Sequence, residues 1–230
     1  MRLTKQYLDL YRRGEEILLR AGVSGFPIDP TWLAHQNGVL VVGYERFSAV
    51  SGVPLAELCE ISEDGFCTYR NGEYIIVYNR AILSAGRKRW TILHELSHIL
   101  LGHISPGNET VYGRTKAVRR WMEKEADILT KCLIAPLPIA LACGVKDENE
   151  LRRLFGLSQE ASEYLYQDYC YLCTDRRILA LEGEALVAQN SRFLIEWQLR
   201  RFYFSEEQNR RGKHGKYCDV SVIPEDDELE

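Results

Sequence analysis

The chain has 230 residues, of which 46% are hydrophobic and 27% are charged. These proportions are close to those of soluble globular proteins, and they exclude collagen-like and wholly disordered chains. No stretch approaches the ~18 uninterrupted apolar residues of a membrane helix. The N-terminal segment is charged and lacks the apolar core of a signal peptide. We therefore expect a cytoplasmic protein that has no membrane partner.

The cysteine count and the charge distribution restrict the chain further. Seven cysteines cannot all pair with one another, which favours reduced thiols in a reducing compartment. The formal net charge is −4, but residues 225–230 alone contribute −5, so the rest of the chain is close to neutral. A protein that neutralises many phosphates has a strong basic excess. We therefore do not expect nucleic acid as a direct partner.

The first half of the chain alternates helical and extended patterns. Apolar residues recur at helical spacing from Thr4 to Ala21, and Gly22 follows as a C-terminal cap. Asp29-Pro30 is typical of a helix start. Asn71-Gly72 predicts a β-hairpin between two apolar runs. These patterns predict a small, mainly antiparallel sheet formed from residues 39–43, 57–70 and 73–79.

The second half is predicted to be helical. A buried helix is expected from Arg89 to Leu101, followed by a loop over residues 103–115 and a second long helix over residues 117–135. Residues 151–170 predict two short helices that resemble half of a helix-turn-helix, with a packing corner as the favoured interpretation. The fold class is therefore α+β, a small sheet packed on helices. We expect one domain over residues 1–174 and an unassigned C-terminal extension, residues 175–230, with additional helices and a mobile acidic tail.

An H-E-x-x-H motif lies on the predicted buried helix. His94 and His98 are four residues apart and share one face, so both imidazoles can reach a single zinc ion. Glu95 is offset by one position and can address a water molecule beside that ion. Two histidines and a carboxylate on an apolar helix would be costly to bury without a partner, which disfavours two ordinary core histidines.

A third protein ligand is expected from the next helix, which offers three carboxylates. The apolar stripe of this helix has Glu123 and Asp127 on one flank and Glu125 on the other. This pattern favours Glu123 as the ligand and Glu125 as the alternative. Asp127 can then accept the remaining N–H of a ligand histidine.

The chain resembles the ImmA/IrrE family of bacterial zinc metallopeptidases, which mobile elements often encode. The resemblance covers about residues 5–170 and rests on YIIVYN, RWTILHELSHILLGH, EKEADILTKCLIAP and LRRLFGLSQEAS. It implies a zincin-like fold, with His94 and His98 as zinc ligands, Glu95 as catalytic base and a glutamate from the following helix as third ligand. Nothing in residues 175–230 belongs to this resemblance.

The resemblance also implies an activity and a partner. The expected activity is zinc-dependent endopeptidase cleavage of a cytoplasmic protein, a helix-turn-helix transcriptional repressor. The alternative is a metal-containing regulatory protein that binds a repressor or DNA without proteolysis. Incubation with a cognate repressor discriminates the two. Cleavage that chelation of the metal abolishes would support the endopeptidase, and binding of the repressor that Glu95→Gln leaves unaffected would support the regulator.

Two further site predictions come from the residues around the motif. A peptidase needs a donor for the oxyanion that forms during attack, and Tyr112 and His103 are candidates because they lie in or beside the loop between the metal helices. The segment EYIIVYN is predicted to be a sheet edge that binds the substrate by strand addition, through Tyr74, Ile76 and Tyr78.

Overall fold

The computed structural model describes residues 5–110, 114–174 and 183–214, with side chains up to residue 202. Its helices and strands are α1 (Lys5–Ala21), α2 (Pro30–Gln36), β1 (Val39–Gly43), α3 (Tyr44–Ser51), α4 (Leu55–Ile61), β2 (Gly65–Arg70), β3 (Glu73–Tyr78), α5 (Ala85–Leu100), α6 (Lys116–Ile134), α7 (Leu137–Ala142), α8 (Glu148–Phe155), α9 (Gln159–Leu172), α11 (Glu184–Gln189) and α12 (Ser191–His214). The architecture is α+β, as the sequence predicts. Within the described ranges, no helix has both the length and the apolar character that a bilayer span requires.

The sheet has three strands in the order β1-β3-β2. The predicted hairpin joins β2 to β3, with Asn71 at φ 54° and Gly72 at φ 86°. Positive φ at both central residues is what a type I′ turn requires, which explains the Asn-Gly pair. On its other side β3 pairs with β1 in parallel, with Val41 opposite Ile76. The sheet is therefore mixed.

Three expectations about this sheet are wrong. Its two strand pairs are one parallel and one antiparallel, so it is not mainly antiparallel. Residues 55–61 form α4 instead of the first part of a strand, because Leu55 and Leu58 follow a helical period after Pro54. Strand β3 is the central strand and not an edge, since β1 occupies its second side.

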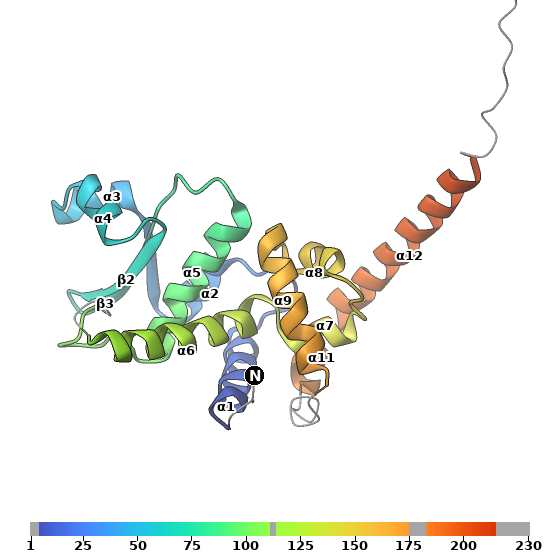
Figure 1. Cartoon of the computed structure of the whole chain (residues 1–230), viewed down its shortest axis with the longest axis horizontal. Helices are drawn as coiled ribbons and strands as arrows, with labels where there is room; N and C mark the ends of the chain where they lie inside the picture. The colour runs from blue at the N-terminus through green and yellow to red at the C-terminus, as the bar shows by residue number, and fades with distance from the viewer. Residues whose placement is uncertain (1–4, 111–113, 175–182, 215–230) are drawn as a thin grey trace, which may run out of the picture.

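The two faces of the sheet are covered by different helices. Alternate residues of β3 point to opposite faces. Ile76 joins the main core together with Cys67 of β2, on the side where α5 packs. Val77 and Phe66 join a smaller cluster with residues of α3 and α4. Figure 1 shows this arrangement, with α3 and α4 beyond one side of the sheet and α5 and α6 on the other.

The helices that follow the sheet close the core. Gly22 (φ 74°) follows α1, and the side chain of Asp29 caps α2, as predicted. Helices α8 and α9 pack on each other around Gly156, and Ser158 caps α9. Helix α12 extends away from the rest of the molecule (Figure 1). The acidic segment 225–230 lies outside the described residues.

Helix α1 packs closely along α6. A Cβ atom built on Gly14 would lie 2.6 Å from the Cβ of Cys132, so only glycine allows this approach. The neighbouring Glu15 is half-buried, and burial raises its pKa to about 7, with Arg12 acting in the opposite direction. Folding therefore holds a proton on Glu15 that the unfolded chain, with a glutamate pKa of about 4.3, releases earlier.

The stability contribution of Glu15 should depend on pH. Because the pKa is raised in the folded state, the contribution is fully present below about pH 4 and is lost as the pH rises towards 7. Glu15→Gln removes this loss, so the variant should be more stable than the wild type at pH 8 by about 1–2 kcal/mol, a value reduced for partial solvent exposure. Thermal melting at pH 8 and pH 4 measures the difference, which should vanish at pH 4. Glu16→Gln, at an exposed neighbour, is the control and should show no such trend.

Candidate metal centre

The candidate site is built on the contact between α5 and α6. Ser84 caps α5 and Thr115 caps α6. Where the helices cross, the hydroxyls of Ser97 and Thr130 lie 3.0 Å apart, and both residues are fully buried. Each hydroxyl also contacts a carbonyl of its own helix, that of Leu93 or Ala126. This polar contact within an apolar interface fixes how the two helices are aligned.

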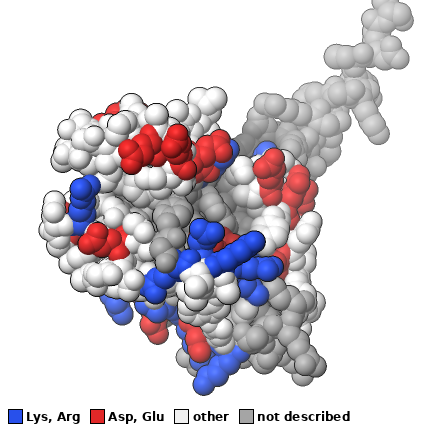
Figure 2. Space-filling view, turned by 60° about the vertical axis from the view of Figure 1, so that its left-hand side comes forward, with Lys and Arg blue, Asp and Glu red and all other residues white. Residues whose placement is uncertain are grey.

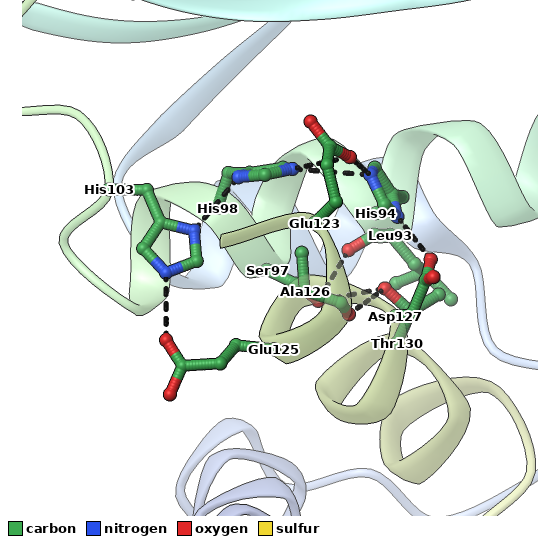
Figure 3. A network of polar contacts seen from close by, with 10 residues as sticks. All are labelled: Leu93, His94, Ser97, His98, His103, Glu123, Glu125, Ala126, Asp127 and Thr130. Atoms are coloured by element: carbon green, nitrogen blue, oxygen red, sulfur yellow. Dashed lines mark hydrogen bonds and ion pairs between the residues drawn. The ribbon is translucent and has the colours of Figure 1, made fainter. Parts of the chain in front are cut away.

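Three ligand-type atoms converge beside this contact. His94 Nε2 lies 3.1 Å from Glu123 Oε2 and 3.2 Å from His98 Nε2, and His98 Nε2 lies 3.5 Å from the same oxygen of Glu123. The three groups form the one potential metal-binding cluster found among the described residues. Figure 3 shows the two imidazoles of α5 facing the carboxylate of α6.

The spacing of these atoms is compatible with a bound zinc ion. Tetrahedral zinc with ligand bonds of about 2.0–2.1 Å has ligands about 3.3–3.4 Å apart, close to the three separations in the cluster. Three lone pairs directed at one point also repel one another unless a proton or a cation lies between them. The residues therefore fit a metal ion with three protein ligands.

The charges in the cluster are strongly coupled. Burial lowers the pKa of His94, but hydrogen bonding to Asp127 and Glu123 outweighs this effect and raises the pKa to about 10. Contacts with His94 and His98 hold the pKa of Glu123 well below its usual range. Glu123 is therefore a carboxylate at neutral pH and is available to a cation.

Glu95 lies next to the cluster, and its partner was not foreseen from the sequence. The thiol of Cys67, from β2, lies within hydrogen-bonding reach of the Glu95 carboxylate. Burial and the charge of Glu95 both raise the pKa of Cys67, so the thiol stays protonated and donates to Glu95. Burial also raises the pKa of Glu95, an effect that His94 and His98 oppose. Cys67 alternates with Phe66 in a buried strand, and only the paired fold brings it to Glu95.

Asp127 lies behind His94. Its Oδ1 is 3.2 Å from His94 Nδ1, within ion-pair distance. This is the side of the imidazole away from the cluster, where a partner of a ligand histidine would lie. The supporting role of Asp127 stays a prediction.

The two remaining candidates around the motif have different surroundings. Both ring nitrogens of His103 are engaged, Nδ1 with His98 Nδ1 at 2.8 Å and Nε2 with Glu125 Oε2 at 3.3 Å. His103 thus lies behind His98 and does not face the cluster, so this placement does not support an oxyanion donor. Glu125 likewise contacts His103 and not the cluster. Tyr112 lies outside the described residues.

The surface beside the site is rich in basic side chains. Helix α6 begins with Lys116, Arg119 and Arg120 and has no acidic residue in its first turn. No ion pair is formed by these three residues within the described part of the chain. Figure 2 shows a band of Lys and Arg side chains across the middle of this face, with acidic side chains above it. In Figure 2, further acidic side chains lie to the left of and below this band.

Comparison with known proteins identifies the segment that contains the cluster. Residues 56–165 match the family model of the IrrE N-terminal-like domain, peptidase M78. The matched segment is slightly less than half of the chain and runs from α4 to α9. No curated protein matches the chain.

The metal ligands can be tested one at a time. We expect the wild-type protein to bind one zinc ion, and His98→Ala or Glu123→Ala to lower the bound zinc at least about tenfold, because each removes one of three protein ligands. Metal analysis after dialysis, with circular dichroism to check folding, measures this. Glu125→Ala should retain more zinc than Glu123→Ala, because Glu125 contacts His103 and is not itself a ligand. Full zinc occupancy in a folded Glu123→Ala protein would contradict the assignment.

Proposed function

Because the matched segment makes this chain an ImmA/IrrE family protein, with a metallopeptidase-type function, we propose that it is a zinc-dependent endopeptidase that cleaves a protein substrate. The observation that carries the proposal is the convergence of His94, His98 and Glu123, with Glu95 beside them. Three protein ligands leave a fourth tetrahedral position for water or substrate, which distinguishes catalytic from closed structural zinc sites.

Glu95 is the proposed catalytic base. Zinc held by the three ligands supplies Lewis acidity, which polarises a peptide carbonyl and makes a nearby water more acidic. The Glu95 carboxylate accepts a proton from that water and returns it to the leaving amine. Burial raises the pKa of Glu95, which makes its carboxylate a stronger base towards that water. The Cys67 thiol donates to the carboxylate and restricts its orientation. Tyr112 remains a candidate donor to the oxyanion.

The outer edge of β2 is the proposed docking site for an extended substrate, in place of β3. The two-residue turn makes Arg70 and Glu73 a hydrogen-bonded pair, so Tyr69 and Cys67 direct their backbone groups away from β3. Tyr69 N–H already donates to the carbonyl of Glu109, at 3.2 Å, so a substrate strand would pair with the earlier outward-facing residues, Gly65 and Cys67. A strand added at Cys67 would pass directly beside Glu95.

We propose a helix-turn-helix repressor as the substrate, on the basis of the family. Strand addition requires an extended segment, so cleavage is expected in a linker or an unfolded stretch and not within a helix. Incubation of the zinc-loaded protein with a cognate repressor, followed by mass spectrometry of the products, tests this proposal. Binding of the repressor without cleavage would favour the alternative, a metal-containing regulator.

Replacing the catalytic base should separate chemistry from metal binding. Glu95→Gln should keep zinc and the fold but lower the rate of cleavage by about 100-fold or more, since general base catalysis contributes factors of this size. Metal analysis and a cleavage assay on the same preparation measure both properties. Glu60→Gln, at an exposed position on α4, is the control. Cleavage at nearly the wild-type rate by zinc-loaded Glu95→Gln would exclude Glu95 as the base.

A proline at position 67 tests the docking edge. The N–H of Cys67 faces away from β3, so Cys67→Pro removes an outward donor without removing a hydrogen bond of the sheet. Loss of one backbone hydrogen bond to the substrate should raise KM about tenfold. Cys67→Ala is the matched control, because it also lacks the thiol but retains the N–H. Equal KM values in the two folded, zinc-loaded variants would show that the substrate does not pair here.

A further inference from the structure

A chain of buried polar contacts continues from the metal cluster to Glu125. Nε2 of His98 faces the cluster, and its Nδ1 lies 2.8 Å from His103 Nδ1. On the far side of His103, Nε2 lies 3.3 Å from Glu125 Oε2. His98 is 1% exposed and His103 is 3% exposed, so water does not substitute for these partners. Figure 3 shows the three side chains in this order.

The chain has one consistent arrangement of protons when Glu125 is a carboxylate. A carboxylate only accepts hydrogen bonds, so His103 must carry its proton on Nε2. The other nitrogen of a neutral imidazole, here Nδ1 at 2.8 Å from His98 Nδ1, is then an acceptor. His98 must therefore donate from Nδ1. This leaves the lone pair of His98 Nε2 directed at the cluster.

The backbone places His103 for this contact. Helix α5 ends at Leu100, and Gly102 adopts φ 74°, a left-handed conformation that favours glycine. The next residue turns back, and the N–H of His103 donates to the carbonyl of His98 at 3.0 Å. The His103 ring is thereby held against the His98 ring in an edge-on contact, with the ring centroids 5.0 Å apart.

We propose that His103 and Glu125 are positioning residues that hold His98 in the tautomer and orientation required for metal binding. The inference rests on the proposed function, because it assigns a role around the same metal. It also gives the three carboxylates of α6 separate tasks. Glu123 faces the metal position, Asp127 stands behind His94, and Glu125 acts on His98 through His103. Helix α6 thus supports His94 directly, through Asp127, and His98 indirectly, through Glu125 and His103.

The affinity of the folded protein for zinc tests the proposal without any substrate. Competition with a chromophoric chelator should show affinity about 10–100-fold weaker for His103→Ala and for Glu125→Leu, the range typical for loss of such partners. Glu125→Gln should lose much less, because its amide oxygen still accepts the His103 proton. The double variant should be no weaker than the weaker single variant, since both changes break one chain.

A second measurement separates positioning from a merely structural role. In NMR spectra of the wild-type protein, the Nδ1–H of His98 should be protected from exchange, and His103→Ala should abolish this protection. His103→Asn should restore part of the zinc affinity, because its side-chain oxygen can accept from His98. The exposed His35→Ala is the matched control for removal of a histidine and should leave the affinity unchanged.

The outcomes distinguish this proposal from the proposed function. Unchanged zinc affinity in folded His103→Ala and Glu125→Leu would overturn the positioning role, even if the metal-free proteins melt at lower temperature, and would leave the peptidase proposal intact. Weakened zinc affinity together with a wild-type protein that cleaves no repressor would support the positioning role and count against the proposed function.

Discussion

The crossing of α5 and α6 is the constraint on which the site depends. The H-E-x-x-H motif supplies two ligand-type residues from one helix, but the third comes from a helix that begins 16 residues after α5 ends. The buried contact between the hydroxyls of Ser97 and Thr130 favours the observed alignment, because a shift of one turn along either helix axis would separate the two hydroxyls. The metal cluster and the contacts behind it all lie within a few turns of that crossing.

Features encoded over short distances were predictable from the sequence. The face shared by His94 and His98 follows from a spacing of four residues on a helix. The hairpin at Asn71-Gly72 follows from the positive φ that a two-residue turn requires. The cap at Asp29 is equally local. The preference for Glu123 over Glu125 used only the apolar stripe of α6, and the structure brings the Glu123 carboxylate to the two histidines.

Features that depend on pairing between distant segments were not predictable in this way. The apolar run of β3 is the same whether one or two strands pair with it, so its central position appeared only when β1 was placed in parallel beside it. The contacts of Cys67 with Glu95 and of His103 with Glu125 have the same origin, since no period along one segment relates these residues. A polar residue on an otherwise apolar stripe, such as Ser97 or Thr130, was the available signal. Such a residue indicates a buried position that needs a hydrogen-bond partner, but it does not identify that partner.

The close approach of α1 to α6 links two positions that are far apart in the chain. Gly14 leaves room for the side chain of Cys132, and α6 carries the metal-facing Glu123 two and a half turns before that cysteine. A larger residue at position 14 would displace α6 from α1 and with it the alignment of the cluster. The Cβ of residue 132 causes this conflict, and every residue except glycine has a Cβ. Related chains with the same helix packing should therefore keep glycine at one of these two positions, even though neither residue touches the chemistry.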